Sequence, residues 1–75
     1  MTLEEWKAKL LEQSNICAIC KTDDPGRRGW SVDHDHETGK VRDLLCFNCN
    51  AGLGKFGDDV SLLQAAIEYL KRHGQ

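Results

Sequence analysis

Four cysteines form two pairs with the same internal spacing, and their chemistry is the most specific in the sequence. Cys17 and Cys20 make the first pair, Cys46 and Cys49 make the second, and 25 residues separate the two pairs. Each short turn can present two thiolates to one tetrahedral ion. Zinc held by four cysteines keeps no open coordination position, so we predict a structural zinc site that holds the fold and does no chemistry.

The same cysteines allow other arrangements. Two disulfides are one alternative, although they require an oxidising compartment and the sequence shows no export signal. Free thiols and an iron centre are further alternatives. His34 or His36 could also replace one of the cysteines in the zinc shell.

A second cluster, Asp33-His34-Asp35-His36, places two carboxylates and two imidazoles in four consecutive residues. A carboxylate suits a hard cation such as Mg²⁺, and a neutral imidazole can take a proton from water near neutral pH. Metal-assisted hydrolysis of a phosphodiester requires these two functions side by side. The alternative interpretation is a polar hairpin end that carries surface histidines.

A helix and a hairpin are predicted before the second cysteine pair. Thr2 is followed three residues later by Glu5, which is a capping-box pattern, and apolar residues then recur at helical spacing to predict a helix over 3–13. Alternating apolar and polar residues predict strands near 30–33 and 41–45, joined through a turn. The far end of this hairpin carries the Asp-His-Asp-His cluster.

Two helices are predicted after the hairpin. The segment from Cys46 to Leu53 is predicted to form a short helix before Gly54, and it carries the second cysteine pair. Asp58 or Asp59 can cap a last helix, which ends in basic residues and has one apolar face. That face consists of Val60, Leu63, Ala66, Ile67 and Leu70.

Length and composition limit the class of protein. A chain of 75 residues buries only about 60% of its unfolded surface, so it usually needs a metal, disulfides or a partner. Its apolar runs are far shorter than the roughly 20 residues that cross a bilayer, and Glu4 and Glu5 stand where a signal peptide is basic. We therefore expect a soluble, cytoplasmic protein with no membrane partner.

The charge of the chain is nearly balanced. The formal net charge is −2, and no segment is a basic arm. This argues against a protein that coats polyanions, although it does not exclude nucleic acid. If the protein binds DNA, a few placed cations and a divalent metal must offset the phosphate charge locally.

Together these motifs closely resemble the recombination endonuclease VII family, which belongs to the HNH, or ββα-metal, nucleases. The resemblance covers about Cys17 to Leu70. It implies an α+β fold, namely a small zinc-stabilised ββα-metal domain with an N-terminal and a C-terminal helix. We expect one domain over 1–75, with the first helix in 1–15, the zinc-bound core in 16–57 and the last helix in 58–75. The motifs that carry the resemblance are Cys17-Ala18-Ile19-Cys20, the segment Val32 to Arg42, and the segment Leu44 to Asn50 with Leu53-Gly54 after it.

The resemblance also implies a division of labour. Asp33 matches the metal-binding carboxylate of the family, His34 its general base, and Asn50 the helix residue that gives the catalytic Mg²⁺ or Mn²⁺ a second ligand. Because Asn50 directly follows Cys49, the structural zinc can fix the helix that presents it.

Further residues match less central positions. His36 matches a second family histidine that assists at the phosphate, and Lys40 and Arg42 are candidates for contacts with DNA phosphates. Asp43 stands where relatives often have glycine, which adds a negative charge near the expected DNA face.

The resemblance predicts a small, phage-type, metal-dependent DNA endonuclease. It would nick or cut phosphodiester bonds with little sequence preference, since nothing in the chain resembles a base-reading helix. One alternative is a dimeric enzyme that resolves branched DNA such as Holliday junctions. An alternative of another class is a catalytically silent zinc module that binds nucleic acid. We expect a monomer or a weak dimer in a phage-infected or prophage-bearing bacterial cell.

Overall fold

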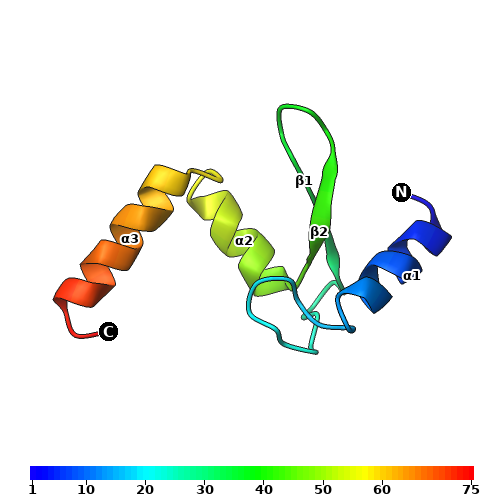
Figure 1. Ribbon diagram of the computed structural model, residues 1–75, viewed down its shortest axis with the longest axis horizontal. Helices are drawn as coiled ribbons and strands as arrows, with labels where there is room; N and C mark the ends of the chain where they lie inside the picture. The colour runs from blue at the N-terminus through cyan, green and yellow to red at the C-terminus, as the bar shows by residue number, and fades with distance from the viewer.

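The computed structural model describes residues 1–75 and shows a β-hairpin flanked by helices (Figure 1). The two strands are antiparallel neighbours, α2 contacts both of them, and α1 contacts β2. This is the small α+β domain that the sequence predicts. In chain order the elements are α1 (Leu3–Glu12), β1 (Ser31–His34), β2 (Val41–Leu45), α2 (Phe47–Lys55) and α3 (Val60–Arg72).

The predicted caps start their helices. Thr2 and Glu5 form the reciprocal capping box of α1, with both hydrogen bonds at 3.1 Å. The carboxylate of Asp59 accepts hydrogen bonds from two backbone N–H groups in the first turn of α3. The predicted boundaries differ little from the observed ones: β1 lies one residue further along the chain than expected, and α2 continues through Gly54 to Lys55.

The hairpin contains an irregularity that the sequence does not reveal. Val32 pairs with Leu44 and His34 with Val41, so the single residue Asp33 lies opposite both Arg42 and Asp43. Such a bulge locally bends and twists the strand pair and changes the direction of its side chains. Here it lies beside the residue that the sequence singles out as a metal ligand.

Gln13, at the end of α1, completes the hydrogen bonding of β2. Its side-chain amide donates to the carbonyl of Leu44 at 2.9 Å, and its side-chain carbonyl accepts from the N–H of Leu44 at 2.8 Å. The amide thereby pairs with the strand as a neighbouring strand would. Lys9 adds a second link between α1 and β2 through an ion pair of 2.9 Å with Asp43. The added negative charge of Asp43 is therefore partnered within the chain.

The core is very small and is built around sulfur. Only Cys17, Leu44, Leu45 and Cys46 are buried. Cys17, Leu45 and Cys46 form one cluster, and four partly buried residues pack against it: Ala18, Trp30, Cys49 and Leu53. So little buried apolar surface gives only weak stabilisation, because the hydrophobic free energy scales with the area removed from water.

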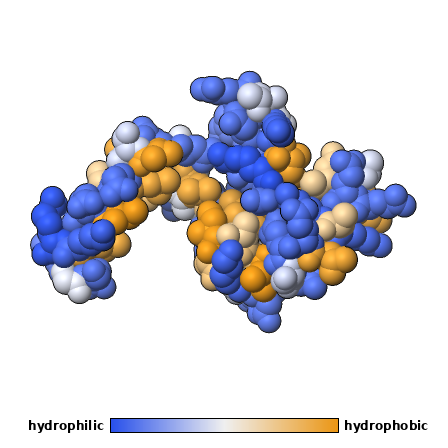
Figure 2. All heavy atoms as spheres, viewed as in Figure 1, coloured by the Kyte–Doolittle hydropathy of each residue, from blue (hydrophilic) through white to orange (hydrophobic).

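Helix α3 stands away from the rest of the chain and packs against no other helix or strand (Figure 1). Its apolar residues form an exposed stripe, which Figure 2 shows along the helix. The chain is accordingly elongated, with a radius of gyration of 13.9 Å and extents of 44 × 28 × 21 Å. None of the helices is long and apolar enough to cross a membrane.

We predict that Gln13→Ala lowers the free energy of unfolding of the zinc-loaded chain by about 1–3 kcal/mol, because it leaves the buried N–H of Leu44 without a partner. Chemical denaturation followed by circular dichroism measures this. The control is Gln64→Ala on exposed α3, where the amide bonds only Glu68 and the expected change is below about 0.5 kcal/mol. Equal effects of the two substitutions would contradict a structural role for Gln13.

Candidate functional site

The four cysteine sulfurs converge on one point. All four thiols are free, and their sulfurs lie within 4.8 Å of one another. The sulfurs of Cys20 and Cys46 are 3.7 Å apart. Four sulfurs bound to a tetrahedral zinc ion at about 2.3 Å lie about 3.8 Å from one another, so the cluster has the dimensions of a zinc site. It contains no histidine, so neither His34 nor His36 takes the place of a cysteine.

Backbone N–H groups hold these sulfurs in place. The N–H groups of Ile19 and Cys46 both donate to the sulfur of Cys17, and the N–H of Cys49 donates to the sulfur of Cys46. Cys46 also ends the hairpin and caps α2. A metal ion at this cluster therefore joins the loop after α1, the end of β2 and the first turn of α2.

The thiols differ in their protonation. Burial opposes ionisation of Cys17, but the backbone N–H of Cys46 and other hydrogen bonds prevail and lower its pKa to about 6. Burial and the neighbouring thiols raise the pKa of Cys49 to about 12. The cluster therefore already holds a thiolate at neutral pH, and zinc must displace the proton of Cys49.

Asp33 and Arg42 face each other across the hairpin. The guanidinium Nε donates to Oδ2 of Asp33 at 2.6 Å, and Nη2 donates to Oδ1 at 2.9 Å. Nη2 also donates to Oδ2 of Asp58 at 3.0 Å. The hydrogen bond with Asp33, and then that with Asp58, raises the pKa of Arg42, which keeps the guanidinium charged. Arg42 thus connects β1 to the segment between α2 and α3.

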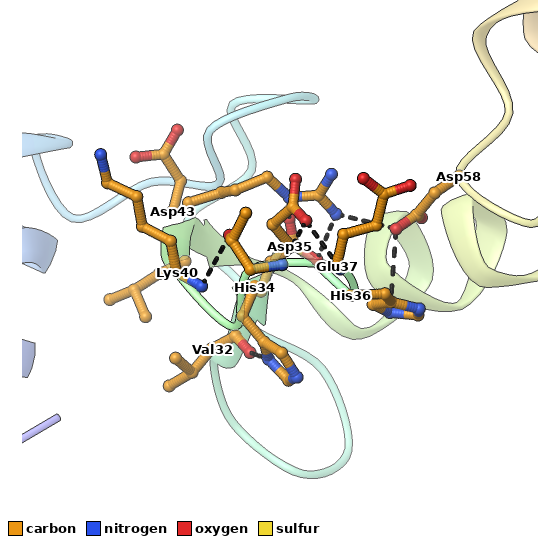
Figure 3. Close-up of polar contacts among 12 residues, drawn as sticks. Val32, His34, Asp35, His36, Glu37, Lys40, Asp43 and Asp58 are labelled. Atoms are coloured by element: carbon orange, nitrogen blue, oxygen red, sulfur yellow. Dashed lines mark hydrogen bonds and ion pairs between the residues drawn. The ribbon is translucent and has the colours of Figure 1, made fainter.

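The two histidines of the cluster are exposed and lie close together, with ring centroids 5.9 Å apart. Figure 3 shows His34 beside the carbonyl of Val32 and His36 turned toward Asp58. The Nδ1 of His34 is 3.4 Å from the carbonyl oxygen of Val32. The Nε2 of His36 is 3.8 Å from Oδ2 of Asp58. Both imidazoles can therefore be reached by a molecule from solvent.

Asp35, unlike Asp33, serves the turn of the hairpin. Its Oδ1 accepts hydrogen bonds from the backbone N–H groups of Glu37 and Thr38 at 2.8 and 3.0 Å. These bonds, that of Thr38 foremost, lower the pKa of the Asp35 carboxyl. The turn thereby fixes the point at which the extended strand ends.

The remaining predicted site residues lie on the surface. Asn50 is exposed on α2, immediately after Cys49, and its backbone N–H bonds the carbonyl of Cys46. Lys40 is exposed just before β2. The carboxylate of Asp33 and the amide oxygen of Asn50 are of the ligand type that Mg²⁺ and Mn²⁺ accept.

Asp58 contacts both Arg42 and His36, and the sequence does not predict these contacts. The sequence presents Asp58 only as a candidate cap of the last helix, a role that Asp59 fills. A polar cleft of about 300 Å³ opens between the hairpin turn and the α2–α3 junction. Its lining consists of Asp35, His36, Glu37, Arg42, Gly57 and Asp58. No local pattern in the chain predicts that these residues are neighbours, because their proximity depends on the angle between the hairpin and the end of α2.

The structure thus defines a small α+β domain organised around a four-cysteine metal site, with a hairpin followed by a helix. Comparison with known proteins identifies the group. Residues 1–72 match the recombination endonuclease VII family, so the chain belongs to that family, and the match includes the first helix as well as the motifs.

Two similar proteins come from mycobacteriophages. The chain is 45% identical over 73 residues to the gene 59 protein of Mycobacterium phage D29, covering 96% of this chain and 44% of that protein. It is 46% identical over 59 residues to the gene 59 protein of Mycobacterium phage L5, covering 77% of this chain and 36% of that protein. The chain therefore spans less than half the length of these relatives. No solved structure matches it.

We predict that removing the metal with a chelator unfolds the chain. Structural zinc contributes roughly 10–16 kcal/mol to small domains, as much as or more than the ~5–15 kcal/mol by which whole proteins are stable. Circular dichroism before and after chelation, with zinc restored afterwards, measures this. A chain that keeps its thermal transition without metal would contradict a zinc-dependent core.

We also predict that zinc affinity falls with decreasing pH. Binding displaces at least the proton of Cys49, so affinity should fall at least about tenfold per pH unit below neutrality. Below about pH 6 the thiol of Cys17 is protonated too, and the dependence should steepen. Competition with a chromophoric chelator at several pH values measures the slope. An affinity independent of pH would contradict this picture of the thiols.

Proposed function

We propose that this chain is a metal-dependent DNA endonuclease that hydrolyses phosphodiester bonds with little sequence preference. The observation that carries this function is the end of the hairpin, where Asp33 and His34 are consecutive residues of β1 and the imidazole of His34 is exposed. Membership of the recombination endonuclease VII family supports the same chemistry. DNA is the expected partner.

Asp33 and Asn50 would hold a Mg²⁺ or Mn²⁺ ion. When bound, this ion supplies positive charge for the crowded phosphate and the leaving 3′ oxygen. Neutral His34 takes a proton from the attacking water, and its exposure leaves room for that water. His36, whose ring centroid is 5.9 Å from that of His34, would assist at the phosphate.

Lys40 and Arg42 are the proposed phosphate contacts. Lys40 is exposed on the hairpin and free to reach a DNA backbone. Arg42 is engaged with two carboxylates in the free chain, so its contact with DNA requires an exchange of partners. A net charge of −2 and the lack of a basic arm imply modest affinity that is sensitive to salt.

Two similar proteins come from mycobacteriophages, and we propose that this chain acts in the cytoplasm of a phage-infected or prophage-bearing bacterial cell. We expect it to act as a monomer or weak dimer. Dimeric resolution of branched DNA is the second candidate, favoured by the exposed apolar stripe of α3. It requires association in solution and a preference for four-way junctions over duplex.

We predict that the zinc-loaded chain nicks supercoiled plasmid with added Mg²⁺ or Mn²⁺ and that His34→Ala lowers the rate by about 10²–10⁴-fold, the usual contribution of a general base. Gel electrophoresis of relaxed and linear DNA measures this, after both proteins are shown to retain zinc and fold. The matched control is His73→Ala beyond α3, which should keep the wild-type rate.

Two outcomes would count against the enzyme. Equal nicking by wild type and His34→Ala would remove His34 from the role of base. Absence of cleavage on plasmid, branched and single-stranded DNA alike, with binding retained, would identify the chain as a silent zinc module.

A further inference from the structure

Arg42 holds two carboxylates that come from different parts of the fold. Asp33 lies on β1 and is only 11% exposed, whereas Asp58 follows α2 and is 21% exposed. The guanidinium donates to Asp33 from both Nε and Nη2. Nη2 also donates to Asp58. Both oxygens of Asp33 are therefore occupied by one cation in the free chain.

A divalent cation that binds Asp33 competes with this guanidinium. Two cations on the same carboxylate repel each other, and the repulsion is strong over the few ångströms that a shared carboxylate allows. Arg42 must then loosen its contacts with Asp33. Without a second anion nearby, the freed side chain would have no fixed position.

Asp58 supplies that second anion in a fixed place. Its backbone has a positive φ of 57°, and its N–H donates to the carbonyl of Leu53 at 2.9 Å, so the end of α2 sets its position. One oxygen, Oδ2, lies 3.0 Å from Nη2 of Arg42 and 3.8 Å from Nε2 of His36. Figure 3 shows Asp58 beside His36 at the hairpin turn.

We propose that Asp58 is a positioning residue that retains Arg42 beside His36 when Asp33 binds the metal ion, so that Arg42 can then meet the DNA phosphate. Arg42 is thus a counter-ion exchanged between Asp33 and the substrate, with Asp58 as its fixed partner. This role of Asp58 rests on the proposed function, in which Asp33 binds the metal.

The experiment measures the affinity of the zinc-loaded chain for Mn²⁺, without DNA, by calorimetry. Arg42→Gln should tighten binding roughly three- to tenfold because it frees Asp33. Asp58→Asn should weaken binding severalfold because Arg42 then has only Asp33, and asparagine tolerates the positive φ. The matched control is Asp59→Asn, which removes the same charge one residue away and keeps the cap of α3.

The double variant Arg42→Gln, Asp58→Asn separates a positioning role from a direct one. If Asp58 acts through Arg42, adding Asp58→Asn to Arg42→Gln should change Mn²⁺ affinity no more than Asp59→Asn does. If Asp58 were itself a metal ligand, the second substitution would weaken Mn²⁺ tenfold or more, and a positioning role would be overturned. Unchanged affinity in Arg42→Gln would overturn the exchange as well.

Cleavage kinetics on plasmid DNA supply a second measurement. A residue with only a structural role would not change KM selectively. Asp58→Asn should raise KM for plasmid at saturating Mn²⁺ more than it lowers kcat, because Arg42 is no longer held where the phosphate arrives. Asp58→Glu, which keeps the charge, should restore part of the KM. Equal KM values for Asp58→Asn and Asp59→Asn would overturn the exchange.

Asp33→Asn distinguishes the failure of this inference from failure of the proposed function. If it binds Mn²⁺ as the wild type does, the proposed metal ligand is wrong and the exchange falls with it. If it loses Mn²⁺ while Arg42→Gln binds no more tightly than wild type, the exchange alone is overturned and the metal ligand stands.

Discussion

Two of the four buried side chains in this protein are cysteines, and their sulfurs belong to the metal cluster. A chain this short cannot bury enough apolar surface to offset its conformational entropy. Bonds between thiolates and zinc can make up that difference because each is far stronger than a hydrophobic contact. The same cluster ties the loop after α1 to the start of α2, so the placement of the other elements depends on it.

The four-cysteine cluster adjoins the elements that carry the proposed catalytic residues. Cys46 directly follows β2, caps α2 and supplies a thiol, so one residue joins the hairpin to the helix. Asn50 follows within the next turn of α2, and Asp33 lies on the strand opposite β2. Rigid supports of this kind keep ligands in place before a metal or substrate arrives.

Charge is organised locally in a protein whose overall charge is slightly negative. Lys9 pairs with Asp43, and the single positive charge of Arg42 is shared by Asp33 and Asp58. Such pairs reduce the repulsion that a DNA backbone would meet at the acidic hairpin. The ion pairs of Arg42 with Asp33 and Asp58 are partly exposed, so water screens them. A divalent ion can therefore compete for the carboxylates, and a phosphate can compete for the guanidinium.

The sequence by itself determined the elements, the four cysteines that cluster, and the family. Capping patterns, alternation and the two Cys-x-x-Cys turns are local signals, and each came within a residue or two of the structure at α1, β2 and α3. The roles of Asp33, His34 and Asn50 are still predictions that rest on the resemblance. Only the tertiary structure decided that Gln13 pairs with β2, that a bulge sets Arg42 opposite Asp33, and that Asp58 joins them. These contacts join residues far apart in the chain, and no local pattern specifies how the hairpin and the helices meet in space.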